Sequence, residues 1–239
     1  MKPAISLVIP AHNESGFLPA CLEAAGFAAQ RIQSPVETIV VLNRCTDDTE
    51  AIARKHGCVI VHEDAKNLAA IRNAGIAAAS GDIIVTCDAD SRMHPDSFRE
   101  ILHRLGGGTF VGGGAMVLPE RWSAGILASA LAILPYLAFT GVSFGLFWFL
   151  KRDFEEIGGF DERFVSVEDV DFARRLKAHG RKSGRKWGTL MRAPLVTSCR
   201  KFDQFGDWYL FRNPSFVRKA FRGDDRETAD RFWYDVRSD

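Results

Sequence analysis

The sequence has no excess of charge of one sign. Its 239 residues include 31 Lys and Arg against 30 Asp and Glu, which gives a formal net charge of +1. A protein-wide electrostatic field that would attract nucleic acid or an acidic membrane is therefore excluded. We expect no nucleic-acid partner, and any basic binding surface has to be local.

Cysteine pairs and targeting signals are also lacking. The five cysteines are odd in number and widely scattered, without a C-x-x-C pair or a histidine at metal-binding spacing. The apolar run near the N-terminus ends at Pro10 and has neither the length nor the cleavage site of a signal peptide. The interpretation that fits is a cytoplasmic protein with reduced thiols.

One long stretch lacks charge altogether. Residues 124–150 contain no charged side chain and have basic residues on both sides, so their length alone would allow a transmembrane helix. Pro135 and several small residues after it interrupt the run. We expect instead a buried or membrane-surface helix over 123–134 and a strand over 142–150. Peripheral association with the inner face of a membrane stays open.

The first 105 residues alternate between two patterns. With 46% hydrophobic residues the chain can build one sizeable core, so one domain is expected. Strands are predicted at 4–9, 36–42, 58–62 and after Gly81, and helices at 17–29, 47–56, 67–79 and 95–105. This alternation indicates an α/β fold, a Rossmann-type mostly parallel sheet flanked by helices. Ligands of such sheets bind beyond the carboxyl ends of the strands.

The pattern becomes irregular after Leu105. Two glycine triplets, at 106–108 and 112–114, flank short β-type pieces at 109–111 and 115–118. The second half of the chain is therefore predicted to be less regular than the first.

Asp88 and Asp90 directly follow a buried strand and are separated by one residue. Their side chains point to the same side of an extended chain, because the side-chain repeat of a strand is two residues. Adjacent carboxylates repel each other unless a cation lies between them, and hard divalent ions take oxygen ligands. Mg²⁺ prefers one or two carboxylates plus substrate phosphates, so the pair suits a nucleotide diphosphate. The alternative is a strand-end turn that caps the next helix.

A second acidic cluster follows a glycine-rich turn. Glu168, Asp169 and Asp171 stand at the start of a predicted helix, where the helix dipole stabilises carboxylates. The alternative is that they are only first-turn charges on a solvated helix.

Together these stretches resemble the family 2 glycosyltransferases, which share the nucleotide-sugar-binding fold called GT-A. The resemblance covers about residues 4–180. It rests on Leu7-Val8-Ile9-Pro10-Ala11-His12-Asn13-Glu14, Cys45-Thr46-Asp47-Asp48-Thr49, Ile71-Arg72-Asn73-Ala74-Gly75, Gly81-Asp82-Ile83-Ile84, Asp88-Ala89-Asp90, and Gly158-Gly159-Phe160-Asp161-Glu162 leading to Glu168-Asp169.

On the donor side, the resemblance implies a nucleotide-diphosphate sugar, with a UDP- or GDP-sugar expected. The nucleotide would lie against the loop of Pro10, Ala11, His12 and Glu14 and the loop at Asn43, with Arg72 near the donor. Asp88 and Asp90 would hold Mg²⁺ or Mn²⁺ on the diphosphate, with Asp90 as the direct ligand, and Asp88 and Ala89 would lie against the donor. Arg200 or Lys201 would touch the diphosphate; a solvated basic turn is the alternative.

On the acceptor side, the resemblance implies an inverting transfer of the hexosyltransferase type. Asp169, with Glu168 beside it, would be the general base on an acceptor hydroxyl. The chemistry is consistent, since an alcohol needs a carboxylate to take its proton, and a metal and an arginine can neutralise the leaving diphosphate. The acceptor, a saccharide, a lipid or a small molecule, is left open.

The chain departs from the family pattern at Leu42 and Asn43, where an acidic residue is frequent. The Asn43 amide can bond a base edge, but Leu42 cannot, so the identity of the nucleotide stays open. Two other functions remain: a nucleotide-sugar-binding protein without transfer activity, and a sugar nucleotidyltransferase, although the glycine-rich, lysine-containing signature of the latter is absent.

The single GT-A-like domain would divide into a nucleotide-sugar-binding half (1–105), an acceptor-binding half (106–211) and a C-terminal tail (212–239). In the second half, Trp148 is either a stacking floor for an acceptor or part of the core, and core packing is favoured. The basic residues at 181–186 could attract phospholipid or a phosphorylated acceptor, or form a solvated loop.

Overall fold

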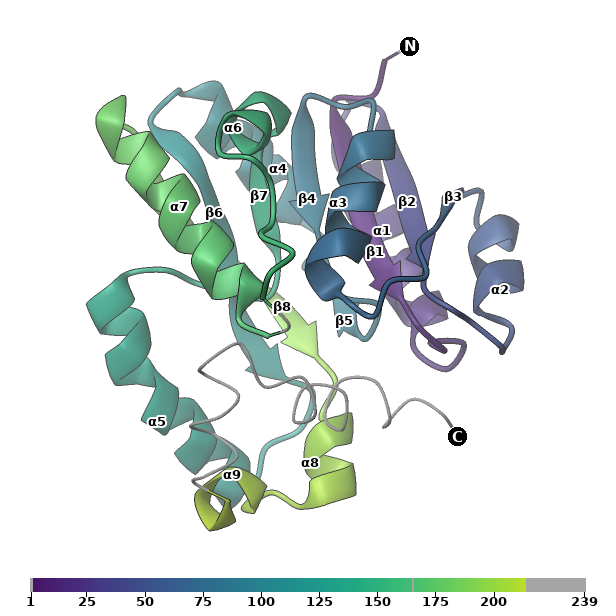
Figure 1. The fold of residues 1–239 in the computed structure, drawn as a ribbon, viewed down its shortest axis with the longest axis vertical. Helices are drawn as coiled ribbons and strands as arrows, with labels where there is room; N and C mark the ends of the chain where they lie inside the picture. The colour runs from purple at the N-terminus through teal and green to yellow at the C-terminus, as the bar shows by residue number, and fades with distance from the viewer. Residues whose placement is uncertain (1, 165, 214–239) are drawn as a thin grey trace.

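One eight-stranded sheet runs through the computed structural model, which describes residues 2–164 and 166–213 without the side chains of 136–139. The predicted tail therefore lies outside the described residues from position 214 onward. The strand order is β3-β2-β1-β4-β7-β6-β8-β5 (Figure 1). Four of the seven strand pairings are parallel, which agrees with a mostly parallel sheet.

The first half of the sheet is parallel throughout and has helices on both faces. Its strands are β1 (Ile5–Ala11), β2 (Val36–Leu42), β3 (Val59–His62) and β4 (Ile83–Thr86), and its helices are α1 (Leu18–Gln30), α2 (Thr49–Lys55) and α3 (Leu68–Ala78). All seven residues of β1 are buried, as expected for a strand covered on both faces. The predicted alternation of strands and helices is confirmed, with boundaries shifted by a few residues.

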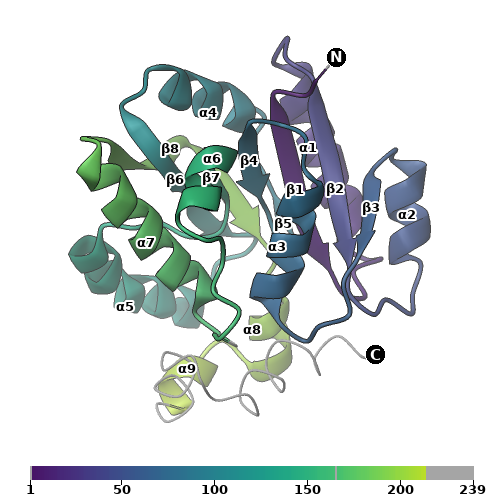
Figure 2. The ribbon, with the colours of Figure 1, turned by 45° about the horizontal axis from the view of Figure 1, so that its top comes forward.

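The second half adds mixed pairings to the same sheet. Its strands are β5 (Ser91–Arg92), β6 (Phe110–Pro119), β7 (Phe147–Leu150) and β8 (Lys186–Thr197). Its helices are α4 (Ser97–Gly106), α5 (Ala124–Thr140), α6 (Lys151–Glu156), α7 (Glu168–Lys182), α8 (Arg200–Phe205) and α9 (Tyr209–Arg212). Helices α1 and α4 pack on one face of the sheet, and α3 and α7 on the other (Figures 1 and 2).

The prediction of two short β-type pieces around the second glycine triplet is wrong, because β6 continues through it. A Cβ atom on Gly113 would lie 2.1 Å from the Gly188 carbonyl oxygen and 2.4 Å from the Trp148 ring. The glycines therefore do not break the strand here; they let β8 and an indole ring approach it. The same packing decides between the two roles considered for Trp148. Its side chain is fully buried and its Nε1–H donates to the Gly114 carbonyl oxygen over 3.1 Å, so it belongs to the core and is not a stacking floor for an acceptor.

The uncharged stretch differs from expectation in its boundaries. The predicted helix over 123–134 extends to Thr140 with Pro135 inside it, and the predicted strand over 142–150 is formed only at 147–150. Across the described part of the chain, no helix combines the length and the apolar character needed to cross a membrane.

Candidate active site

The D-x-D motif follows β4 at the carboxyl edge of the sheet. Ala89 is buried, whereas 45% of the Asp88 side chain is exposed. Asp90 is held by the second half of the chain: the Ser198 backbone N–H donates to the Asp90 carbonyl oxygen over 3.1 Å, and Ser198 Oγ donates to Asp90 Oδ2 over 2.9 Å. The antiparallel pairing of β5 with β8 produces this contact. Ser198 carried no sequence signal beyond its proximity to Arg200.

Arg200, the first residue of α8, lies between Glu14 and Asp90. Its guanidinium donates to both oxygens of Glu14 over 2.8 and 3.0 Å, and Nη2 lies 3.0 Å from Asp90 Oδ2. The Phe17 ring lies 5.1 Å from Arg200 Cζ. Burial alone would lower the pKa of Arg200, but Glu14 and Asp90 outweigh it and raise the pKa. Arg200 therefore stays cationic beside the D-x-D motif, which excludes a solvated basic turn.

Glu14 is buried, with 1% of its surface exposed. Its backbone N–H donates to Thr49 Oγ1 over 2.8 Å, and its carbonyl oxygen accepts from Phe17 and Leu18 at the start of α1. The sequence predicted a donor-binding residue here. The carboxylate pairs with Arg200, so the Glu14 side chain can act on the D-x-D motif through that guanidinium.

Arg72 on α3 connects the two acidic clusters. Nη2 lies 3.2 Å from Asp88 Oδ1 and Nη1 lies 2.6 Å from Glu168 Oε1. The side chain is buried, with the Phe160 ring 5.5 Å away. Burial would lower the pKa of Arg72, but Asp88, Glu168 and Asp169 together raise it. The structure thus brings Arg72, Asp88 and Glu168 together, although Arg72 and Glu168 are 96 residues apart in the chain.

Asp169 stands in the first turn of α7, a helix that begins directly after Val167, whose φ of 59° is left-handed. Its carboxylate accepts from the Val170 backbone N–H over 2.7 Å. Burial raises the pKa of Asp169 to about 7, with a further contribution from the adjacent Glu168 charge that Arg72 opposes. A carboxylate with a pKa near neutrality is suited to accept a proton from a hydroxyl. Glu168 binds Arg72, and its carboxylate adds a negative charge beside Asp169.

The loops after β1 and β2, which the resemblance assigns to the nucleotide, are shaped by their own contacts. Pro10 and Ala11 are the last residues of β1, and His12 Nδ1 lies 2.5 Å from the Asn43 carbonyl oxygen. The Asn43 amide donates to the carbonyl oxygens of Glu63 and Ala65, and its oxygen accepts from the neighbouring Arg44. The expected bond from the Asn43 amide to a base edge is therefore not available in this structure, since protein groups already occupy that amide.

Asn73 is a residue that the sequence interpretation missed. Its side-chain amide donates to the Phe160 carbonyl over 2.9 Å and accepts from the Phe160 N–H over 3.0 Å. This two-way pairing fastens α3 to the turn that precedes α7, next to Arg72. The only available signal was its place beside Arg72 in the Ile-Arg-Asn-Ala-Gly stretch.

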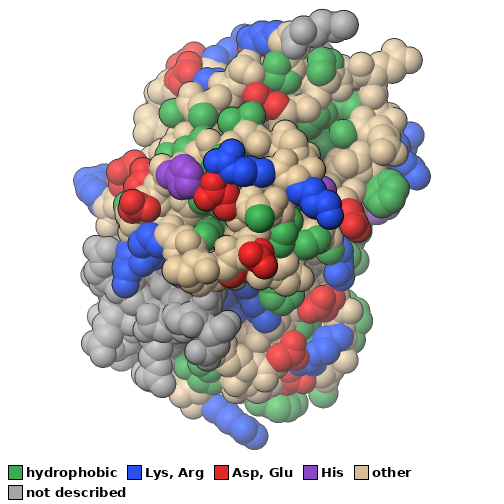
Figure 3. Space-filling model, turned by 90° about the vertical axis from the view of Figure 1, so that its right-hand side faces the viewer, with side chains coloured by type: hydrophobic (Ala, Val, Ile, Leu, Met, Phe, Trp, Pro, Cys, Tyr) green, Lys and Arg blue, Asp and Glu red, His purple; other side chains and the backbone are tan. Residues whose placement is uncertain are grey.

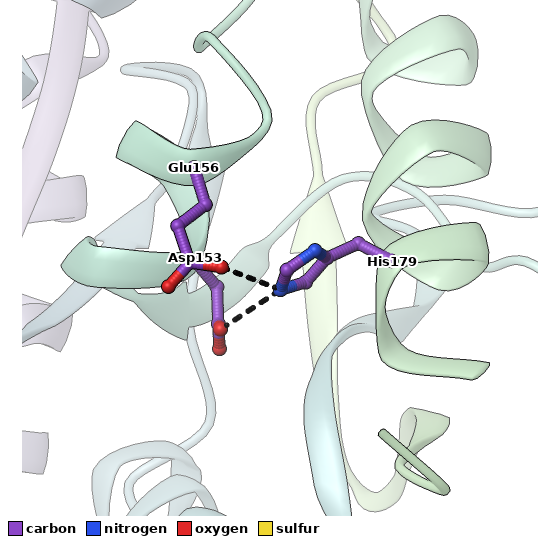
Figure 4. A group of neighbouring side chains, drawn as sticks. All are labelled: Asp153, Glu156 and His179. Carbon is purple, nitrogen blue, oxygen red and sulfur yellow. Dashed lines mark hydrogen bonds and ion pairs between the residues drawn. The ribbon is translucent and has the colours of Figure 1, made fainter. Parts of the chain in front are cut away.

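Asp153, Glu156 and His179 form a separate group that has metal-ligand side chains (Figure 4). His179 Nε2 lies 3.2 Å from Asp153 and 3.5 Å from Glu156. Arg185 already contacts both Asp153 oxygens, over 2.6 and 2.8 Å. A metal ion bound here would have to displace the guanidinium or lie beside its positive charge. The group is therefore better explained as an ion-pair cluster that joins α6, α7 and the start of β8.

The sheet, its strand-end carboxylates and the helix-start carboxylates define the GT-A class of α/β fold. The model of the family described as "Glycosyl transferase family 2" matches residues 6–133, and the chain belongs to that family. It is 24% identical to glycosyltransferase AglE of Haloferax volcanii over 238 residues, which cover 92% of this chain and 71% of AglE. Several other curated relatives match over about 104 to 109 residues, less than half of their own length.

Two solved structures show the same fold. S. aureus TarS 1–349 in complex with UDP-GlcNAc is 13% identical with a TM-score of 0.65, over 97% of this chain and 71% of TarS 1–349. The mannosyltransferase PcManGT from Pyrobaculum calidifontis, in complex with GDP-Man and Mn²⁺, is 18% identical with a TM-score of 0.63, over 82% of this chain and 57% of PcManGT. At these identities the likeness concerns the fold alone.

Proposed function

We propose that the chain transfers a sugar from a nucleotide-diphosphate sugar to an acceptor hydroxyl in a single inverting displacement. One observation carries the proposal: buried Arg72 contacts a carboxylate of the D-x-D motif and a carboxylate next to Asp169. The leaving-group side and the acceptor side of one reaction would then meet at one guanidinium. Both the family membership and the complexes of TarS with UDP-GlcNAc and of PcManGT with GDP-Man support a UDP- or GDP-sugar donor.

On the donor side, the nucleotide would lie against the loops after β1 and β2, with its diphosphate beside Asp88, Asp90 and Arg200. The two carboxylates offer the oxygen ligands that Mg²⁺ or Mn²⁺ takes together with substrate phosphates, and PcManGT was solved with Mn²⁺. A metal held there would supply positive charge to the departing diphosphate. Arg200, which remains cationic, would stabilise the same charge from the other side.

On the acceptor side, Asp169 would take the hydroxyl proton as the new bond to the anomeric carbon forms. Its pKa near 7 keeps a large fraction ionised at neutral pH and still leaves it basic enough to accept the proton. Arg72 and Glu168 would set this balance, because the guanidinium favours the ionised form and the neighbouring carboxylate disfavours it.

The deciding experiment compares Asp169→Asn with Asp171→Asn. Asp171 lies in the same helical turn but pairs with Arg175 over 2.6 Å, so it is a matched control for first-turn charge. We expect Asp169→Asn to bind UDP or GDP with Mn²⁺ as the parent does, yet to lose transfer to an acceptor panel and hydrolysis of the donor. Equal loss in both variants, or full activity of Asp169→Asn, would refute the base assignment. Nucleotide binding by a parent chain that never turns over would favour a binding protein.

A further inference from the structure

Helix α5 is attached at its ends and exposes apolar side chains between them. Gly125 lies against Asp207, and Lys177 Nζ donates to the carbonyl oxygens of Thr140 and Gly141 over 2.7 and 2.9 Å. Between these points the helix carries no charged residue, and residues 131–135 are all exposed. Leu127, Leu131 and Leu134 are 48%, 56% and 52% exposed. Their spacing puts them on one side of the helix. An apolar surface of this extent marks a binding site.

Helix α7 adds a basic row to the same side of the molecule. Arg174, Lys177 and Arg181 recur at helical spacing, and Arg174 and Arg181 are exposed. A hollow of about 490 Å³ joins this row to the end of α5 at Thr140, and four of its seven lining residues are basic. A second hollow of about 430 Å³ at the start of α5 is lined by Trp122, Ser123, Ala124 and Leu127.

The end of α5 meets α7 at Lys177 (Figures 1 and 2), so the exposed leucines of one helix and the basic row of the other lie on neighbouring elements. The opposite side of the molecule, over α2 and β3, carries acidic and basic side chains interspersed with each other (Figure 3). With a net charge of only +1, the basic row on α7 is a local feature and not a property of the whole surface.

We propose that the surface formed by α5 and the basic row of α7 docks onto an anionic phospholipid bilayer. The leucines of α5 would enter the boundary between headgroups and acyl chains, and the arginines would lie among the lipid phosphates. Charge favours a lipid surface over residues 214–239 as the partner of the basic row. Those residues include six basic and six acidic side chains, so they carry no net negative charge to pair with the row. The docking surface does not depend on the proposed transfer reaction.

Flotation of the full-length protein with vesicles tests this assignment without donor or acceptor. We expect the protein to float with phosphatidylcholine vesicles that contain phosphatidylglycerol, to stay largely free with pure phosphatidylcholine, and to be released by salt. Arg174→Glu combined with Arg181→Glu should lower the bound fraction roughly tenfold or more, because each reversal acts near the anionic surface. Leu131→Glu combined with Leu134→Glu should abolish binding on both lipid mixtures.

Matched controls come from the opposite side. Arg54→Glu combined with Lys55→Glu on α2 changes the net charge by the same amount, and Phe27→Glu replaces an aromatic ring that is 60% exposed on α1. Both controls should float like the parent, with melting temperatures of all variants showing that they are folded. Equal loss in the controls, no flotation of the parent, or a self-association that the α5 variant abolishes would each overturn the proposal; the last would assign the surface to a second copy.

Discussion

Arg200 and Glu14 are 186 residues apart in the chain and form an ion pair with two hydrogen bonds at the carboxyl edge of the sheet. The loop after β1 and the start of α8 meet there because β5 pairs with β8 and thereby delivers residues 198–200 to Asp90. The pair fixes a cation beside the D-x-D motif, where the proposed function places the donor diphosphate. Such preorganisation matters because charge that is already oriented needs no rearrangement as the leaving group departs.

Replacing Glu14 by Gln should destabilise the fold and weaken donor binding together. Glu14 is 1% exposed, so its loss leaves the Arg200 guanidinium without its two-bond partner. Breaking a buried ion pair lowers the free energy of unfolding by about 3–5 kcal/mol. Because the Arg200 side chain is partly exposed, we expect a loss at the lower end of this range, about 3 kcal/mol. Urea unfolding and donor titration would measure both effects. In a double-mutant cycle with Arg200→Gln, additive free energies would contradict the coupling.

Asp90→Ala should abolish metal-dependent stabilisation by UDP or GDP. The oxygen ligands of the proposed metal are lost, and Arg200 loses its contact with Asp90 at 3.0 Å. We expect kcat/KM to fall by roughly a hundredfold or more and the nucleotide-induced rise in Tm to disappear. Asp82→Asn is the matched control, since Asp82 lies before β4 in an exposed pair with Lys2. An unchanged Mn²⁺-dependent Tm shift in Asp90→Ala would remove Asp90 from the metal site.

Activity should rise with pH through about 7, because Asp169 must be ionised to accept a proton and burial raises its pKa to about 7. Glu168→Gln removes a negative charge that contributes to this shift, so the acidic limb of the kcat/KM profile should move to lower pH. Profiles measured with saturating donor would show the direction. A limb that stays in place, or moves upward, would show that Glu168 does not control Asp169.

The same raised pKa has a consequence for stability. The folded protein holds the Asp169 proton more tightly than the unfolded chain does, so this group stabilises the fold at acidic pH and that contribution is lost as pH rises from about 4 to about 7. Asp169→Asn removes the titration, and its free energy of unfolding should fall less steeply over that range than that of the parent. Parallel urea titrations at several pH values would check this; identical slopes would contradict it.

Arg185→Met should destabilise the protein by about 3–5 kcal/mol, because it leaves the buried Asp153 carboxylate without its guanidinium. Burial would raise the pKa of Asp153, but Arg185 and His179 lower it, so the pair's contribution is present above about pH 4 and is lost as pH falls below it. Glu156→Gln is the control, since that side chain is 61% exposed. A rise in Tm on adding Mn²⁺ or Zn²⁺, removed by Glu156→Gln, would instead establish a metal site.

The first half of the fold and the positions of both acidic clusters could be predicted from short stretches of sequence. A strand buried on both faces reads as a continuous apolar run, as in β1, and a helix begins where its first-turn carboxylates stand, as in α7. The glycines at 112–114 show the limit of such patterns. Locally they resemble a loop, yet the approach of Trp148 and Gly188 makes them the residues that a strand needs there.

The sequence by itself determined which ionisable and polar residues could form the candidate site, because residue type and local spacing can be read directly from it. Only the tertiary structure decided what each one touches. Arg72 contacts both acidic clusters, Arg200 pairs with Glu14, and Arg185 pairs with Asp153. The Asn43 amide is bonded to backbone carbonyls and not held open. These partners are brought together by strand register and helix packing, which depend on the whole sheet, so no local pattern could have identified them.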